Sequence, residues 1–390
     1  MRESVRRMVC LRRVWGVFAP FLLAALCACG SRGCGREPAA EGQKSSLPKE
    51  IAYVGRFDLG DSARFAWSGS TIRVRFEGAS SIAVRLKVAS PGYGFNPPEL
   101  AYAIRVDDRP KAALAVNPGE ARYELAHGLD PSTPHEIALT REAEAFAGID
   151  ALLAVELPEG GRFLPVPPRR HRLEVVGDSI SAGYGILGAN AQCRFSFATE
   201  RASITYGALL GQALDADVTI VAWSGKGMLR NFDGTTEDTM PELFERTLPT
   251  EPTSTWKFGS PADAVIVNLG TNDWFGGGGR PLEIRAFEDT YVRFLHRVRE
   301  VHPRAFVFVV SSPMLEDQMT PSGPGTASEL SRKSLQRVVE RRRAEGETRI
   351  EFVDLEPQGP NVGCDSHPNA ESHRRMAARL EPSLRAQLDR

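Results

Sequence analysis

Three polar clusters in this sequence carry side chains that could do chemistry together. Each follows an apolar run: Gly177-Asp178-Ser179, Gly270-Thr271-Asn272-Asp273 and Asp365-Ser366-His367. A serine hydroxyl is a weak nucleophile until a base removes its proton, and histidine is the commonest base. Ser179, His367 and Asp365 are therefore the candidate nucleophile, base and orienting group for acyl transfer through a covalent serine ester.

Three hydrogen-bond donors could stabilise the oxyanion of such a reaction. They are the backbone N–H groups of Ser179 and Gly225 and the side-chain amide of Asn272. Glycine at position 225 would let the backbone approach a substrate closely. Trp223 and Trp274 lie beside these residues in the sequence and are candidate sugar-binding side chains, with core packing as the alternative for both.

Other polar residues near the clusters are assigned structural roles. His373 falls within the last predicted helix, Asp178 would shape the serine turn, and Asp273 would cap a helix or order its loop. The run GYGILG at 183–188 matches a dinucleotide fingerprint in form, but the serine turn already occupies the strand-to-helix position that this fingerprint requires. No histidine or cysteine spacing is typical of a metal site. We therefore expect neither a nucleotide nor a metal.

The second half of the chain has the pattern of an α/β domain, predicted over 171–390. Five short apolar runs are rich in β-forming residues: 173–176, 218–221, 264–269, 306–310 and 350–353. Stretches between them, such as 284–301 and 329–344, can form amphipathic helices. This alternation predicts a parallel sheet of about five strands with helical crossovers. The candidate chemical residues follow four of the strands, so they should meet at the carboxyl edge of the sheet.

The preceding part alternates apolar and polar residues with a period of two. The alternation is clearest at 72–76, 82–88 and 102–106. Short alternating strands separated by Pro-Gly and Asn-Pro turns predict an antiparallel, jelly-roll-like β-sandwich over 51–160. A proline-rich linker is predicted at 161–170.

The N-terminal segment has the pattern of an export signal. A basic segment precedes an apolar, uncharged run, and together they predict a signal peptide at 1–29, followed by a flexible tether at 30–50. The segment LCAC at 26–29 resembles a bacterial lipobox in which Cys29 carries the lipid. We expect a membrane-anchored lipoprotein in the periplasm or at the cell surface; a plainly cleaved signal and a secreted protein are the alternative.

Cysteine content and charge add two further expectations. Cys193 follows the serine turn and Cys364 adjoins Asp365, so a disulfide joins them if the two loops meet; two separate buried thiols are the alternative. The net charge of −1 gives no reason to expect a nucleic-acid partner.

Several longer motifs carry a resemblance to a known family. They are GRF at 55–57, WSGS at 67–70, GDSISAGYG at 177–185, SGKG at 224–227, GTND at 270–273 and CDSHPN at 364–369. These motifs resemble the SGNH hydrolase superfamily, and most closely carbohydrate esterase family 2, which joins a β-sandwich to an SGNH domain. The superfamily usually has Asp-x-x-His, whereas here only one residue separates Asp365 from His367. Some members are thought to orient the histidine by a backbone carbonyl instead.

The resemblance implies a serine esterase that removes O-acetyl groups from an acetylated polysaccharide such as xylan or mannan. It implies an acetyl-enzyme intermediate and no cofactor. Peptidoglycan O-acetylesterase, lipase and thioesterase activities are alternatives within the superfamily. A non-catalytic carbohydrate-binding lipoprotein is an alternative of a different class, and the sandwich itself could bind glycan or only form a wall of the site.

Overall fold

The computed structural model describes residues 47–91, 100–276, 280–316 and 326–389. The predicted signal peptide, Cys29 and all but the last residues of the tether lie outside these ranges. None of the described helices is both long enough and apolar enough to cross a membrane.

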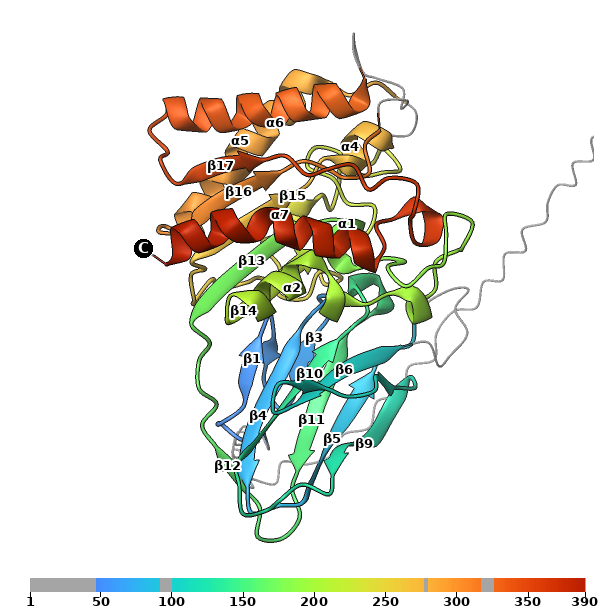
Figure 1. Ribbon diagram of the computed structural model, residues 1–390, viewed down its shortest axis with the longest axis vertical. Coiled ribbons are helices and arrows are strands. Elements are labelled where there is room, and N and C mark those ends of the chain that lie inside the picture. Colours follow the sequence, from blue (N-terminus) through green and yellow to red (C-terminus); the bar gives the residue numbers. More distant parts are fainter. Residues whose placement is uncertain (1–46, 92–99, 277–279, 317–325, 390) are drawn as a thin grey trace, which may run out of the picture. The chain divides into compact units, whose positions relative to one another are not determined.

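The N-terminal part is the predicted antiparallel β-sandwich (Figure 1). One sheet has the order β1 (Ala52–Val54), β4 (Thr71–Glu77), β10 (His135–Arg141), β6 (Ala101–Val106) and β7 (Arg109–Pro110), with β12 (Arg162–Leu164) on β4 and β8 (Leu114–Ala115) on β6. The other has the order β2 (Asp58–Leu59), β3 (Ala63–Phe65), β11 (Asp150–Glu156), β5 (Ser81–Val88) and β9 (Gly119–His127). Apolar side chains of both sheets form one core. Strand β12 lies within the segment predicted as linker, which therefore begins in the sheet.

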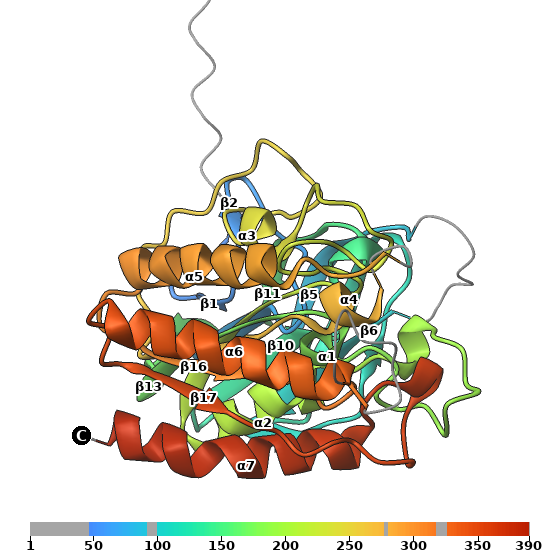
Figure 2. The ribbon, with the colours of Figure 1, turned by 90° about the horizontal axis from the view of Figure 1, so that it is seen from above.

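The C-terminal part contains the predicted five-stranded parallel sheet. Its order is β14 (Ala216–Ala222), β13 (His171–Gly177), β15 (Ala264–Asn268), β16 (Phe306–Val310) and β17 (Ile350–Val353). Two helices pack on each face: α2 (Tyr206–Ala213) and α7 (Ala370–Leu388) on one, and α5 (Ile284–Val301) and α6 (Ala327–Ala344) on the other. Figure 2 shows α7 and α5 on opposite sides of the sheet. Both faces are covered, which explains why these strands are continuous apolar runs.

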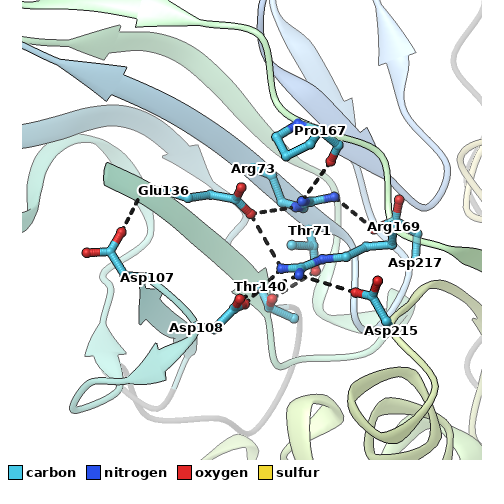
Figure 3. A network of polar contacts seen from close by, with 10 residues as sticks. All are labelled: Thr71, Arg73, Asp107, Asp108, Glu136, Thr140, Pro167, Arg169, Asp215 and Asp217. Carbon is cyan, nitrogen blue, oxygen red and sulfur yellow. Dashed lines mark hydrogen bonds and ion pairs between the residues drawn. The ribbon is translucent and has the colours of Figure 1, made fainter. Parts of the chain in front are cut away.

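Polar contacts join the sandwich to the sheet edge at β14 (Figure 3). Arg73 on β4 pairs with Glu136 at 2.9 Å and with Asp217 of β14 at 3.1 Å. Arg169 of the linker reaches Glu136 at 3.5 Å and Asp215 at 3.4 Å. Strand alternation places Arg73 on the outer face of the sandwich, yet this face is buried because the second domain packs on it.

Candidate active site

The serine turn is built where the central strand β13 ends. The Asp178 carboxylate accepts a hydrogen bond from the N–H of Ile180 at 3.0 Å and caps α1 (Ser179–Ala182), so it shapes the turn. Ser179 is the first residue of this helix, where a backbone N–H has no intrahelical partner. A side chain at position 177 would lie 2.0 Å from the Ser181 hydroxyl, so the strand must end on glycine for the turn to fit.

His367 lies in hydrogen-bonding position to the serine. Its Nε2 is 2.9 Å from the Ser179 Oγ, and its Nδ1 is 3.2 Å from the backbone carbonyl oxygen of Asp365. The carbonyl can only accept, so Nδ1 carries the proton and Nε2 is left to accept from the serine hydroxyl. This tautomer is the one that a general base requires.

The orienting role predicted for the Asp365 side chain is corrected by the structure. Its carboxylate accepts from the Tyr184 hydroxyl at 3.0 Å, the Phe195 N–H at 2.9 Å and the Arg194 guanidinium at 3.0 Å, and it does not bond the imidazole. Asp365 has a left-handed backbone, with φ of 50°. This tight turn directs the backbone carbonyl, not the carboxylate, to the ring of His367. Partial burial raises the pKa of the Asp365 carboxyl, but the hydrogen bonds from Phe195, Tyr184 and Arg194 outweigh it, so the pKa is lower than usual.

Tyr184 was not singled out from the sequence. Its ring centroid lies 4.2 Å from that of His367, and its hydroxyl donates to Asp365. The tyrosine therefore forms one wall of the imidazole site, and the Asp365 carboxylate holds it there. Nothing in its spacing from Ser179 distinguishes it from a core aromatic residue.

The loops carrying Cys193 and Cys364 meet beside this wall. The two cysteines form a disulfide with Cα atoms 4.4 Å apart, and the N–H of Asp365 donates to the Cys193 carbonyl at 2.8 Å. Gly185 and Gly188 of the apparent dinucleotide fingerprint pack against the same loop, since a Cβ at Gly188 would lie 2.2 Å from the backbone nitrogen of Cys364. These glycines therefore allow close packing of two loops.

The three candidate oxyanion donors follow β13, β14 and β15. Gly225 has φ of 79°, a left-handed conformation that favours glycine. No described residue accepts a hydrogen bond from its N–H. The Asn272 amide donates one hydrogen bond to the Lys226 carbonyl at 2.8 Å, which fixes the amide against the Gly225 loop and leaves its second hydrogen for a ligand.

Asp273 orders the loop that follows Gly225. Its buried carboxylate accepts from the N–H groups of Met228, Leu229 and Arg230 at 2.7–2.9 Å. Burial raises its pKa to about 6, and the three backbone donors oppose the rise. The Arg230 side chain donates back to the Asp273 carbonyl, so this loop is held from both sides.

The predicted sugar-binding role is wrong for Trp274. Its side chain is only 4% exposed and packs edge-on against Phe287 in the core. Within α4 (Thr271–Phe275) every residue except Phe275 is buried, and Trp274 faces the core. Trp223 is half-buried, with the Lys226 ammonium 5.3 Å from its ring centroid. His373 is buried and accepts from the Tyr206 N–H at 3.1 Å, a structural role.

Two exposed aromatic residues that the sequence did not identify lie beside the oxyanion donors. Phe232 and Phe275 are 49% and 55% exposed and stack with ring centroids 5.9 Å apart. The Phe232 N–H donates to the Gly225 carbonyl at 2.8 Å, and Phe275 belongs to the same short helix as Asn272. We call this pair the aromatic platform. Large apolar rings exposed together at the edge of a polar site are typical of a ligand-binding surface.

Comparisons with known proteins agree with this architecture. Residues 175–375 match the model of the GDSL-like lipase/acylhydrolase family, and residues 53–167 match that of the carbohydrate esterase 2 N-terminal domain. The solved structure of a family two carbohydrate esterase from Clostridium thermocellum, in complex with cellohexaose, superposes with a TM-score of 0.78 at 28% identity. That alignment covers 87% of this chain and 99% of the other.

Curated relatives include two bacterial proteins. The cellulase/esterase CelE of Acetivibrio thermocellus is 28% identical over 355 residues, which are 89% of this chain but only 41% of that protein. An acetylxylan esterase/glucomannan deacetylase of Cellvibrio japonicus is 29% identical over 293 residues, covering 73% of this chain and 75% of the relative. The chain therefore spans less than half of the first relative and three quarters of the second.

Proposed function

Because the chain belongs to the GDSL-like lipase/acylhydrolase family and carries a carbohydrate esterase 2 N-terminal domain, we propose that it is a serine esterase that removes O-acetyl groups from a xylan- or mannan-type polysaccharide. The observation that carries the proposal is the 2.9 Å contact between Ser179 and His367 at the carboxyl edge of the sheet.

The proposed reaction proceeds through an acetyl-enzyme. Ser179 Oγ attacks the acetyl carbonyl carbon while His367 Nε2 takes its proton. The N–H groups of Ser179 and Gly225 and the Asn272 amide stabilise the oxyanion. His367 then protonates the departing sugar oxygen. Water attacks the acetyl-enzyme with His367 again as base, and acetate leaves.

The aromatic platform supports a sugar substrate. Pyranose rings present apolar C–H faces, which stack on exposed aromatic side chains. The Phe232 N–H donates to the Gly225 carbonyl and Phe275 shares a short helix with Asn272, so the two rings lie beside the oxyanion donors. The relative named above as an acetylxylan esterase/glucomannan deacetylase supports the same class of substrate.

Acetate release from acetylated xylan and acetylated glucomannan tests this proposal. We expect release from at least one polymer, with strong preference for acetyl over butyryl esters of 4-nitrophenol. Phe232→Ala should raise KM for the polymer about tenfold and change KM for 4-nitrophenyl acetate little, since only the polymer reaches the platform. Leu187→Ala, another exposed apolar side chain, is the matched control. Preference for long acyl chains would favour a lipase instead.

The pH dependence should reflect the burial of His367. Burial lowers its pKa to about 4, and the backbone carbonyl of Asp365 opposes only part of this effect. The base must be neutral, so kcat/KM should be constant down to about pH 5 and fall as the pH drops through about 4. A kcat/KM profile for 4-nitrophenyl acetate, with circular dichroism at each pH to monitor folding, measures this. Half-maximal activity near pH 6.5 would contradict it.

We propose further that the protein is exported and held at a membrane by lipid on Cys29. The basic and apolar N-terminal segments and the lipobox-like LCAC motif support this localisation. The Cys193–Cys364 disulfide is typical of an oxidising compartment. A detergent requirement for extracting the full-length protein, absent in Cys29→Ser, is the measurement that tests it.

A further inference from the structure

A segment of the sandwich reaches into the catalytic domain between β10 and β11. It is held rigidly by Arg141, whose buried guanidinium donates to the carbonyls of Ala143 and Gly148 at 2.9 and 2.8 Å and pairs with Asp150 at 2.9 Å. A buried guanidinium with this many acceptors fixes the backbone around it. The side chains that follow Arg141 are therefore presented in defined positions.

Two glutamates on this segment bind serines of the catalytic domain in the same way. The Glu142 carboxylate accepts from the N–H and hydroxyl of Ser203 at 2.8 and 2.6 Å. The Glu144 carboxylate accepts from the N–H and hydroxyl of Ser224 at 2.6 and 2.5 Å. Both glutamates are buried. They differ in target, because Ser203 precedes α2 whereas Ser224 immediately precedes Gly225.

Glu144 also contacts a second buried acid, Glu200. The backbone N–H of Glu144 donates to a Glu200 carboxyl oxygen at 3.2 Å, and each of the two side chains shifts the pKa of the other. No described residue forms an ion pair with either carboxyl within 4.0 Å. Ionising both buried carboxyls would place two like charges close together at a large energetic cost, so the two groups share one proton.

The surrounding groups decide where this proton lies. Ser224 donates twice to Glu144, so Glu144 holds the charge and Glu200 holds the proton. Arg141 lowers the pKa of Glu200 while burial and Glu144 raise it, and the net pKa lies well above the usual range. Burial raises the pKa of Glu144, with a smaller contribution from the Asp178 charge, whereas the hydrogen bonds from Ser224 and Glu200 lower it and favour the ionised form.

The loop after β14 is thus held by hydrogen bonds from three other segments. Glu144 holds the N–H and hydroxyl of Ser224, Phe232 donates to the Gly225 carbonyl, and Asn272 donates to the Lys226 carbonyl. The Gly225 N–H itself has no hydrogen-bond partner among the described residues. Fixing the peptides on both sides of this N–H fixes its direction, which is what a preorganised oxyanion donor needs.

We propose that Glu144, with Glu200 as its proton-bearing partner, is a positioning residue that the sandwich domain supplies to aim the Gly225 N–H at the oxyanion. This inference rests on the proposed esterase function. It makes the sandwich an integral part of the active site, since its buried carboxylate completes a loop of the other domain. Glu142 makes the matching contact away from the oxyanion donors and should contribute to domain packing alone.

Glu144→Gln, compared with Glu142→Gln, tests the proposal in the full-length protein. With 4-nitrophenyl acetate, Glu144→Gln should lower kcat about 10–10²-fold with KM changed little, approaching the loss of a whole oxyanion donor. It should weaken inhibition by a boronic acid that forms a tetrahedral adduct on Ser179 by a similar factor. Glu142→Gln should keep kcat and the inhibition constant within about threefold while lowering Tm comparably. Equal kcat in the two variants would overturn the proposal.

If Glu144→Gln does not fold, Glu200→Gln provides a second test of the proposal. The amide can accept from the Glu144 N–H and donate to its carboxylate, so it reproduces protonated Glu200 without titrating. Wild-type kcat should decline at alkaline pH as Glu200 ionises, whereas Glu200→Gln should retain activity to higher pH. Identical alkaline profiles would overturn the proposal.

Hydrogen exchange separates this inference from the esterase proposal. Amide exchange over 223–227 should accelerate in Glu144→Gln and not in Glu142→Gln, whether or not the wild type hydrolyses a given ester. Unchanged exchange in both variants would overturn the positioning role. An inactive wild type with the expected exchange difference would instead overturn the proposed function.

Discussion

Replacing Ser179 with alanine should lower kcat for acetyl-ester hydrolysis by about 10⁴–10⁶-fold and leave Tm nearly unchanged. The substitution removes the atom that forms the acetyl-enzyme, and His367 alone cannot replace it. Within the described residues, His367 is the hydroxyl's one hydrogen-bonding partner, so little folding energy depends on it. Steady-state kinetics with 4-nitrophenyl acetate and a thermal melt of the same preparation measure both effects.

Ser181→Ala is the matched control in the same helix. Its buried hydroxyl is 2.8 Å from that of Tyr206 and lies outside the reacting atoms. The control should lose about 1 kcal/mol of stability and keep kcat within severalfold. If Ser179→Ala kept more than about a tenth of wild-type kcat, the acetyl-enzyme mechanism would be excluded.

The proximity of the nucleophile Ser179 and the oxyanion donor Asn272 could be predicted because strand topology brings them together. Ser179 and the loop of Asn272 follow adjacent parallel strands, so their meeting follows from the sheet alone. The roles of Glu144 and Tyr184 could not be predicted in this way. Glu144 comes from the other domain, and its contact with Ser224 depends on how the two domains dock.

Local geometry explains the two corrections. The direction of the Asp365 carboxylate depends on a left-handed turn that residue types alone do not specify. The burial of Trp274 and the exposure of Phe275, its neighbour, depend on the rotation of a five-residue helix, which is too short for a hydrophobic period to define.

The fold was easier to predict than the domain interface. Alternation at 72–76 identified the strand, and the core side chains Ile72, Val74 and Phe76 are buried. The same pattern placed charged residues on the outer face, where a single domain would expose them. Periodicity could not predict that arginines are buried at the interface between the domains. The residues that cover these arginines lie more than a hundred positions away in the sequence.

Arg56 is the strongest case of such burial. Its fully buried guanidinium pairs with Glu174 of β13 at 2.7 Å and donates to the carbonyl of Arg246 at 3.0 Å. It also packs against the rings of Phe244 and Phe258, at 5.0 and 5.2 Å from their centroids. A sandwich residue thus neutralises a carboxylate buried under the catalytic sheet.

Arg56→Ala should lower the free energy of unfolding by about 3–5 kcal/mol, because it leaves Glu174 buried without its cation and opens a cavity between the aromatic rings. Urea denaturation of both proteins at pH 7 measures the loss. Arg64→Ala is the control, since Arg64 also spans the two domains, to Glu251, but its side chain is 37% exposed. An exposed pair of this kind contributes about 0–1 kcal/mol. Equal losses in the two variants would contradict the argument.

The loss of unfolding free energy in Arg56→Ala should also depend on pH, and the direction of this dependence identifies the cause of the loss. Arg56 and His302 hold the pKa of Glu174 below its usual value despite burial, so in the wild type this carboxylate adds stability above about pH 4.5 that is lost as the pH falls. Without Arg56 the buried carboxyl should titrate higher and prefer to be neutral. The difference in unfolding free energy between wild type and variant should therefore be largest at pH 7 and shrink towards pH 4. A deficit of the same size at both pH values would mean that Arg56 acts through packing against its aromatic neighbours and not through its charge.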